Sequence, residues 1–356
     1  MTKLLLIGGG HAHLSILRSL LHEKMSDLEI TLITSSKFQY YSGMFSGFTE
    51  GLYDEDEIRI DLESLCSRAS VSFIEDTIIS FDPMQKVLLG FSGEIYHFDV
   101  ISFDIEPWVS SELISTSELT PKHHFIEKIK KLRSSEAPVI VGDSSRAVEL
   151  ALSVSSWRNT YNLSNSVTLI SPSSLLHSYG AKATKKIREI AHDHNLEFYE
   201  NEQVNEAKDS YVTTKNGTKI KYSIILPITE PKASSLFKQA LLPVDSDGFL
   251  LVEDTLQNDE YPYVFGAGNC VTISMYSELV KNDFHATKQG PILWRNIKRF
   301  LFGQSLESFK PYTSPFSIIS TGKQQGLFIF RNVTLYGKWV WYMKNFNDQK
   351  FIKRHV

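Results

Sequence analysis

The sequence predicts an α/β protein built from two similar parallel-sheet units and a small C-terminal region. Three observations indicate this fold. A strand, a glycine-containing turn, a helix and a second strand follow one another at the N-terminus, the same order returns about 135 residues later, and short β-rich segments follow each occurrence. At 356 residues the chain also exceeds what one hydrophobic core usually organises.

The first unit has the order that a parallel βαβ unit requires: strand 4–7, a glycine turn, a helix with apolar residues at helical spacing, and strand 29–33. In a Rossmann-like turn the first glycine permits the tight turn and the second lets the backbone approach a pyrophosphate. Gly8 and Gly10 fill these positions. His13 replaces the third glycine, where it either widens the helix–strand gap or brings an imidazole near the phosphates.

Short β-rich pieces after the first unit predict a meander that closes it, formed by residues 71–74, 86–89, 94–96 and 100–103. A polar linker at 110–121 and a helix near 124–132 are expected next.

The second unit repeats the plan with strand 138–141, helix 147–157 and strand 167–170, followed by helix 181–194 and β-rich residues 211–227. Its turn keeps the first glycine as Gly142 but has Ser144 and Ala147 at the next two positions. A second nucleotide site and a plain structural turn are both open interpretations, and Arg146 either contacts a phosphate or lies in solvent.

Both units lack the acidic residue that usually ends the second strand and binds the adenosine ribose. Thr34 and Ser35 stand there in the first unit, and Ser171 stands there in the second. Hydroxyl groups can still bind a ribose, so the choice between NADH and NADPH stays open.

The overall composition excludes several classes of protein. A net charge of -4 gives no electrostatic reason to expect a nucleic acid partner. No apolar run approaches the ~20 residues of a membrane span, and the glycines and histidines after residue 7 interrupt any signal peptide. We expect a mature, cytoplasmic protein.

Few residues have the spacing of a metal or redox site. Cys66 and Cys270 are far apart and form no CxxC pair, so they are expected as buried hydrophobic residues in a reducing compartment. His11 and His13 form an HxH pair, but no Asp, Glu or Cys cluster accompanies them, and no metal is expected.

The last third of the chain contains a strand at 263–265 leading into Gly266–Gly268, a helix at 283–302, and an aromatic and basic tail from residue 317. Aromatic residues mixed with Lys and Arg suit a membrane surface, which would make the protein peripheral to the inner face of the membrane. The alternative is a homodimer contact or a flap over the active site, with buried aromatics.

Together these segments resemble a flavoprotein of the pyridine nucleotide-disulfide oxidoreductase superfamily. The chain is similar to the NADH dehydrogenase-like branch, including type II NADH dehydrogenases and, more closely, the flavoprotein domain fused to selenide, water dikinase. The resemblance depends on the segments GGGHAHL from Gly8, YYSGMFSG from Tyr40, Asp61-Leu62, YHFDVISFDIE from Tyr96, GDSSRAVELAL from Gly142, VFGAGNC from Val264, ATKQGPILWRNI from Ala286 and GKWVWYMKNFNDQKFIKR from Gly337.

The resemblance implies a glutathione-reductase-like pair of domains that bind FAD and NAD(P)H. It implies an FAD-binding domain of residues 1–110 and 242–305, an NAD(P)-binding domain of residues 118–241, and a C-terminal interface region of residues 306–356. The residues it implies for FAD are Gly8, Gly10 and His11 at the pyrophosphate, Ser35 at the adenosine, Ser42, Gly43 and Met44 near the flavin, Gly268 and Asn269 at the ribityl chain and pyrophosphate, and Gln289 and Gly290 at the isoalloxazine. For the nicotinamide nucleotide it implies Gly142, Ser144 and Glu149, with Glu149 and Gln289 as catalytic support.

The function implied is an oxidoreductase in which NAD(P)H reduces FAD and electrons pass to a quinone or a similar small acceptor. The lack of paired cysteines argues against disulfide reductase and sulfide:quinone reductase variants. Several departures support an alternative, an FAD-binding regulatory module without nucleotide turnover: Asn269 for Asp, Ser144 and Glu106 for Gly, and Thr229-Glu230-Pro231 for a small Thr-Gly pair.

Overall fold

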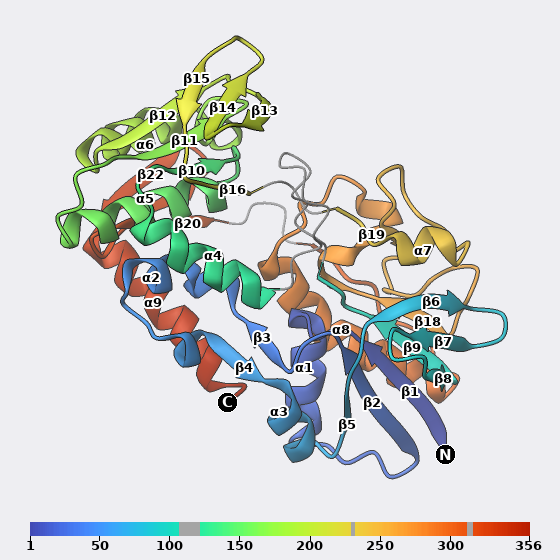
Figure 1. Ribbon diagram of the computed structural model, residues 1–356. Helices are drawn as coiled ribbons and strands as arrows, with labels where there is room; N and C mark the ends of the chain where they lie inside the picture. The colour runs from blue at the N-terminus through green and yellow to red at the C-terminus, as the bar shows by residue number, and fades with distance from the viewer. Residues whose placement is uncertain (107–121, 229–231, 312–315) are drawn as a thin grey trace.

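The computed structural model describes residues 1–106, 122–228, 232–311 and 316–356. Its first unit is a five-stranded sheet in the order β18-β9-β1-β2-β5, in which every pair is parallel (Figure 1). The strands are β1 (Thr2–Ile7), β2 (Leu28–Thr34), β5 (Ser72–Glu75), β9 (Val100–Phe103) and β18 (Val264–Gly266). Helix α1 (His11–Leu20) connects β1 to β2, so the predicted βαβ unit is confirmed.

The first sheet is completed by a strand from far along the chain. β18 pairs with β9 in parallel, with Val264 opposite Ile101. Helix α8 (Asp283–Leu301) follows and packs against α1. Segments near residues 10 and 290 therefore lie side by side in one unit (Figure 1).

The predicted meander is wrong at both ends. Residues 71–74 and 100–103 largely form β5 and β9 of the parallel sheet, and the antiparallel sheet consists of β6 (Ile78–Asp82), β7 (Val87–Gly90) and β8 (Ile95–His97). The physical reason is visible in β9, whose four residues are all buried. A strand buried on both faces is typical of a parallel sheet covered by helices.

The second unit contains a four-stranded parallel sheet in the order β12-β11-β10-β16. Its strands are β10 (Pro138–Val141), β11 (Val167–Ser171), β12 (Leu196–Glu200) and β16 (Ile224–Pro227), and its helices are α4 (Lys122–Ser134), α5 (Ser145–Thr160) and α6 (Ala181–Asp193). An antiparallel sheet of β13 (Val204–Lys208), β14 (Tyr211–Thr214) and β15 (Lys219–Lys221) packs beside it. The repeated architecture is confirmed, and the predicted linker at 110–121 lies outside the described residues.

The C-terminal region folds as an antiparallel sheet covered by a helix. It comprises β20 (Ser317–Gly322), β21 (Gln325–Phe330), β22 (Val333–Gly337) and α9 (Lys338–Lys353). β20 contacts α5 of the second unit, and α9 contacts the segment after β3 of the first unit. The C-terminal region therefore spans both units (Figure 1).

Shorter elements connect these parts. They are β3 (Phe38–Tyr40), β4 (Arg59–Asp61), β17 (Leu250–Val252), β19 (Val271–Ile273), α2 (Phe45–Glu50), α3 (Leu62–Arg68), α7 (Ser235–Gln239) and the 3-10 helices η1 (Ser42–Met44), η2 (Glu55–Ile58), η3 (His177–Tyr179), η4 (Gly268–Cys270) and η5 (Ser274–Tyr276). Within the described part of the chain, no helix combines the length and apolar character that crossing a membrane requires.

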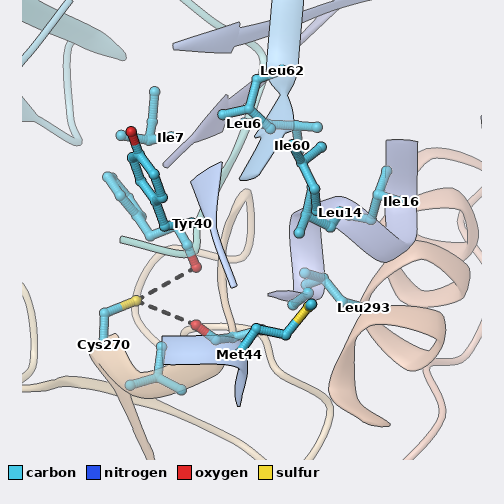
Figure 2. Packing of buried hydrophobic residues seen from close by; sticks show 14 of the residues in the cluster. Leu6, Ile7, Leu14, Ile16, Tyr40, Met44, Ile60, Leu62, Cys270 and Leu293 are labelled. Atoms are coloured by element: carbon cyan, nitrogen blue, oxygen red, sulfur yellow. Dashed lines mark hydrogen bonds between the residues drawn. The ribbon is translucent and has the colours of Figure 1, made fainter. Parts of the chain in front are cut away.

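Buried apolar side chains hold α1 and α8 to the first sheet. Leu6 of β1, Leu14 of α1 and Leu293 of α8 are almost fully buried and belong to one hydrophobic cluster, which also includes residues of the second unit (Figure 2). Burial of each such side chain contributes roughly 1.5–3 kcal/mol. Cys270 is also buried in this cluster and donates its thiol to the carbonyl of Ala267 at 3.3 Å, so it is the hydrophobic residue that the sequence predicts.

Candidate functional site

The first glycine turn is shaped by the segment that follows β9. Gly8 has a φ of +92°, and a Cβ atom there would lie 2.5 Å from the backbone oxygen of Asp104. At Gly10 a Cβ atom would lie 2.3 Å from Oδ1 of the same residue. Neither position has room for a side chain, and the positive φ at Gly8 independently favours glycine.

His13, at the third glycine position, is a core residue. Its ring is fully buried, with Nδ1 2.7 Å from the carbonyl oxygen of Gly8 and Nε2 2.9 Å from Oγ of Ser102. Burial lowers the pKa of this imidazole to about 4, so the ring is neutral at pH 7. Both ring nitrogens are bonded to the first unit itself, which makes His13 a group that ties the turn to β9.

A carboxylate of the chain itself lies at the N-terminus of α1. Oδ2 of Asp104 accepts hydrogen bonds from the backbone N–H groups of Ala12 at 2.7 Å and His13 at 2.9 Å. The residue is 3% exposed. The first N–H groups of a helix and its dipole together attract anions, and a dinucleotide turn uses this position for the pyrophosphate. Asp104 therefore places its own negative charge at the position where a dinucleotide turn binds the negatively charged pyrophosphate.

Gly268, Asn269 and Gln289 lie beside the same helix end. Gly268 has a φ of +76°, and a Cβ atom there would lie 2.1 Å from Oδ1 of Asp104. Its N–H group donates to Oε1 of Gln289 at 2.6 Å, and the Asn269 amide donates to Asp283 at 3.3 Å. The structure thus brings two segments, more than 250 residues apart in the numbering, around one buried carboxylate.

Three other predicted residues have different surroundings. Gly290 allows α8 to approach α1, because a Cβ atom there would lie 2.5 Å from the Cβ atom of Ser15. Met44 is buried in the hydrophobic cluster shown in Figure 2. Ser35 follows β2 and is exposed.

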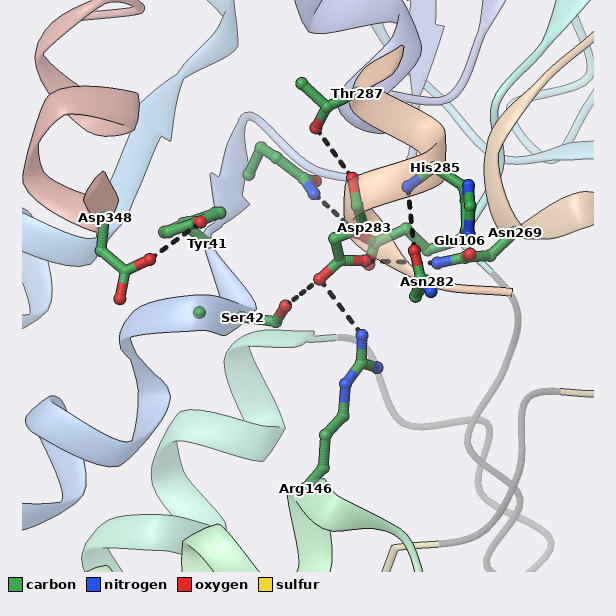
Figure 3. Close-up of polar contacts among 12 residues, drawn as sticks. Tyr41, Ser42, Glu106, Arg146, Asn269, Asn282, Asp283, His285, Thr287 and Asp348 are labelled. Atoms are coloured by element: carbon green, nitrogen blue, oxygen red, sulfur yellow. Dashed lines mark hydrogen bonds and ion pairs between the residues drawn. The ribbon is translucent and has the colours of Figure 1, made fainter. Parts of the chain in front are cut away.

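Asp283 connects four elements at one point. Its carboxylate accepts hydrogen bonds from the Ser42 hydroxyl of η1, from the Asn269 amide of η4 at 3.3 Å, and from Nη2 of Arg146 of α5 at 3.1 Å (Figure 3). The sequence predicts Arg146 at a phosphate or in solvent, whereas in the structure it forms an ion pair across the two units. More than half of the Arg146 side chain is exposed, so this ion pair is weak and can open.

A second charged network connects η1, α5 and α9. The Lys344 ammonium donates to Oδ2 of Asp348 at 2.8 Å and to the backbone oxygen of Gly43, and lies 3.8 Å from Glu149. Burial opposes the charge on Lys344, but the two carboxylates outweigh this effect and raise its pKa. Burial also raises the pKa of Glu149, an effect that the Lys344 cation counteracts.

Aromatic rings extend this network to the first glycine turn. The Tyr41 hydroxyl donates to Oδ1 of Asp348 at 3.0 Å, and the Tyr41 ring stacks on Phe351 of α9 with centroids 4.4 Å apart. Phe351 also lies 5.2 Å from the ring of His11. Helix α9 therefore covers His11, the first residue of α1.

The second glycine turn caps its own helix. A Cβ atom at Gly142 would lie 2.3 Å from the backbone oxygen of Ile228, and the Ser144 hydroxyl accepts a hydrogen bond from the N–H group of Ala147 at 3.3 Å. Glu106, the other residue in a glycine position, accepts a hydrogen bond from Gln39 at 2.7 Å. Thr229-Glu230-Pro231 lie outside the described residues.

Sequence reasoning missed Asp104, Asp283, Lys344 and Asp348 as site residues. Asp104 follows a strand in the first unit, and strand ends in such sheets are where ligands bind. Lys344 and Asp348 are spaced i,i+4 in a helix, which places them on one face. Apart from the Lys344–Asp348 pair, however, the partners of these residues come from distant segments of the chain.

Two parallel-sheet units, each with a glycine turn before a helix, are joined by the Arg146–Asp283 ion pair and have the architecture of proteins that bind two dinucleotides. The chain belongs to the pyridine nucleotide-disulphide oxidoreductase family, whose model matches residues 2–294. It is therefore an FAD-dependent, NAD(P)H dehydrogenase-like oxidoreductase, and the predicted class of protein is confirmed.

Known relatives are similar to nearly the whole chain. Mitochondrial sulfide:quinone oxidoreductase from Dictyostelium discoideum is 21% identical over 88% of this chain and 74% of that protein, and NADH dehydrogenase-like protein YutJ from Bacillus subtilis is 21% identical over 87% and 88%. Among solved structures, sulfide:quinone oxidoreductase from Aquifex aeolicus has a TM-score of 0.81 at 21% identity, covering 99% of this chain and 91% of that one. NDH2 from Plasmodium falciparum in complex with NADH has a TM-score of 0.80 at 12% identity, covering 99% and 98%.

The donor set at the first turn fits the pyrophosphate of FAD. The carboxylate of Asp104 already occupies it as a stand-in anion, held by two backbone N–H groups and flanked by Gly10 and Gly268. The chemistry of the donors is therefore right for a phosphate group, and Asp104 holds the place that such a group would take.

Proposed function

We propose that this oxidoreductase transfers two electrons from NAD(P)H to a quinone or a similar small acceptor. The balanced reaction converts NAD(P)H, one proton and a quinone into NAD(P)⁺ and a quinol. FAD, when bound, supplies the hydride acceptor for the nicotinamide and the electron donor for the second substrate. The protein must bind both nucleotides, exclude water between them and deliver protons.

The observation that carries this proposal is the largely buried network of Glu149, Lys344 and Asp348. Quinone reduction consumes protons as well as electrons, so a proton-exchanging group is needed beside the acceptor. Burial raises the pKa of Glu149 above the ordinary value of a carboxyl group, and Glu149 is the carboxylate of this network that we assign to proton exchange. Lys344 lies 3.8 Å away and donates to the backbone of Gly43, so the network reaches the segment that we assign to the flavin.

The nucleotide-binding roles are part of the proposal. Gly8, Gly10 and His11 would bind the FAD pyrophosphate, with Gly268 and Asn269 on its other side and Ser35 at the adenosine. The remaining assigned residues are Ser42, Gly43, Met44, Gln289 and Gly290 at the flavin, and Gly142 and Ser144 at the nicotinamide nucleotide. These assignments are supported by the lack of room for a side chain at the glycine turns. Gly8 and Gly142 lie against backbone oxygens, and Gly10 lies against the Asp104 carboxylate.

The cysteines favour a nicotinamide donor over a sulfide or disulfide substrate. Cys66 and Cys270 are both buried and unpaired. Burial raises the pKa of the Cys66 thiol to about 12 and also raises that of Cys270. A thiol must ionise to react, so these two residues are poor nucleophiles. The similarity to sulfide:quinone oxidoreductases therefore supports a quinone as the electron acceptor, but it does not support sulfide as the electron donor.

The outer face of α9 suits a position at a membrane surface, where quinones dissolve. Trp339, Tyr342 and Phe346 are 52%, 56% and 66% exposed on this helix. Aromatic side chains with nearby Lys residues partition into the interfacial zone of a bilayer. A homodimer through the same face is the alternative, and gel filtration distinguishes the two.

The decisive experiment is anaerobic flavin spectroscopy of the purified full-length chain. NADH or NADPH should bleach the flavin absorbance, and a soluble short-chain quinone should restore it without oxygen. A flavin that bleaches but is not reoxidised by quinones would overturn the acceptor assignment. A flavin that never bleaches with either nucleotide would favour the regulatory module.

A further inference from the structure

We propose that Asp104 is an internal competitor of the FAD pyrophosphate, so that FAD binds only when this carboxylate leaves the N-terminus of α1. The inference rests on FAD binding to the first unit, but it does not depend on the electron acceptor. It concerns how the cofactor enters, which the proposed reaction leaves open.

The competition follows from the donors that Asp104 uses. Its Oδ2 atom accepts from the N–H groups of Ala12 at 2.7 Å and His13 at 2.9 Å, within the first turn of α1. These are N–H groups that a pyrophosphate at a glycine turn needs, since intrahelical bonds leave them without a partner. A phosphate oxygen and Oδ2 cannot occupy the same position.

Space excludes joint occupancy as clearly as hydrogen bonding does. A Cβ atom on Gly10 would lie 2.3 Å from Oδ1 of Asp104, and one on Gly268 would lie 2.1 Å from it. The carboxylate therefore fills the gap between the two glycines, and Asp104 is only 3% exposed. The absence of side chains at Gly10 and Gly268 creates room for an anion, and the Asp104 carboxylate fills this room.

Charge makes the competition unfavourable to FAD. A carboxylate and a pyrophosphate are both negative, so neither stabilises the other at the helix N-terminus. The apparent affinity of a ligand is proportional to the fraction of molecules that are in the binding-competent conformation. Asp104 should therefore weaken FAD binding, and removing it should strengthen FAD binding. A ligand without phosphate does not bind these N–H groups, so its affinity should not change when Asp104 is removed.

The test measures equilibrium binding to the flavin-stripped full-length chain by calorimetry or by quenching of flavin fluorescence. The probes are FAD, ADP and riboflavin, and the variants are Asp104→Ala and Asp104→Asn. Asp99→Asn is the matched control, because Asp99 also accepts from a backbone N–H group, that of Lys3 at 2.7 Å, at the opposite end of β9. We expect Asp104→Ala to bind FAD and ADP at least about tenfold more tightly, with riboflavin and the control unchanged.

The result for Asp104→Asn gives an independent check if the alanine variant does not fold. Its amide oxygen can still accept from Ala12, but the negative charge is lost, so a smaller gain in FAD and ADP affinity is expected. Thermal melting supplies a second readout: the Asp104 variants should melt below the wild type alone and gain more from added FAD.

Equal or weaker FAD binding by folded Asp104 variants would overturn the proposal while leaving the oxidoreductase function intact. Tighter binding of riboflavin to the same degree would also overturn it, since riboflavin has no phosphate. If neither the wild type nor any variant binds FAD, both the inference and the assignment of FAD to the first unit fail.

Discussion

Lys344 of α9 lies 3.8 Å from Glu149 of α5, and this pair joins the C-terminal helix to the second parallel-sheet unit. Lys344 also donates to Asp348 at 2.8 Å. One largely buried cation therefore contacts two carboxylates from different parts of the chain. Its removal leaves both of them without their nearest positive charge.

We predict that Lys344→Met lowers the free energy of unfolding by about 3–5 kcal/mol, the usual cost of breaking a buried ion pair from one side. It should also reduce quinone turnover, because the pKa of Glu149 rises further without the cation. Denaturant unfolding and steady-state kinetics measure the two effects. Lys350→Met is the control, since Lys350 is an exposed residue of the same helix, and a change below about 0.5 kcal/mol is expected. Equal effects of the two substitutions would contradict the role of Lys344.

Glu50 of α2 gives a prediction about pH. Burial raises the pKa of its carboxyl to about 7, although the N–H groups of Gln324 and Lys323 act in the opposite direction. Since the folded state binds this proton more tightly than the unfolded state, Glu50 makes stability fall as pH rises from about 4.5 to 7, and its penalty is complete above that range.

Glu50→Gln should therefore raise stability at pH 8 by roughly 1–3 kcal/mol and change it little at pH 4. Urea unfolding at the two pH values measures the difference, with the exposed Glu29→Gln of β2 as the control. If Glu50→Gln changes stability equally at pH 8 and at pH 4, burial does not penalise the ionised Glu50 carboxylate.

The contact between α1 and α8 predicts a strict requirement for glycine at position 290. A Cβ atom there would lie 2.5 Å from the Cβ atom of Ser15 and 2.8 Å from the backbone oxygen of Ala12. Gly290→Ala should destabilise the protein by about 1–3 kcal/mol through overpacking. Adding Ser15→Gly removes one of the two clashes, so a double-mutant cycle should show partial recovery. Simple additivity of the two losses would disprove the proposed contact.

The exposed aromatics of α9 predict binding to lipid. Replacing Trp339, Tyr342 and Phe346 together with serine should reduce sedimentation with anionic vesicles several-fold and leave the melting temperature nearly unchanged. The control replaces Tyr161 and Tyr211, which are 62% and 47% exposed on the second unit. If the α9 variant and the wild type sediment equally, the membrane assignment is wrong. A shift from dimer to monomer in gel filtration would instead support the dimer contact.

Local patterns predict most of the parallel-sheet architecture. The run from Leu4 to Gly10 encodes a strand and a turn within a few residues, and the strand predicted at 138–141 has the bounds of β10 in the structure. The errors at β5 and β9 have one cause. A short apolar strand has the same sequence pattern whether its partner strand is parallel or antiparallel, and the partner lies elsewhere in the chain.

The candidate site was less predictable because its charges meet only in three dimensions. Asp104 reaches the N-terminus of α1 from a position more than 90 residues away, and Lys344 reaches Gly43 from about 300 residues away. Glycines could be predicted because backbone geometry is local, whereas the pairing of ionised side chains depends on the tertiary fold. The exact domain boundaries stay predictions.

The place of β18 has a consequence for synthesis of the chain on the ribosome. β18 is the edge strand beside β9, and it begins at Val264, after the whole second unit has been made. Until then the apolar strand β9 has an open edge, which is a site for aggregation. The second unit can fold as its residues emerge, while the first must wait with an unfinished sheet. Nascent chains that end before residue 264 should therefore need chaperones more than longer ones do. During synthesis, the N-terminal unit should be the last part of the chain to become resistant to proteolysis.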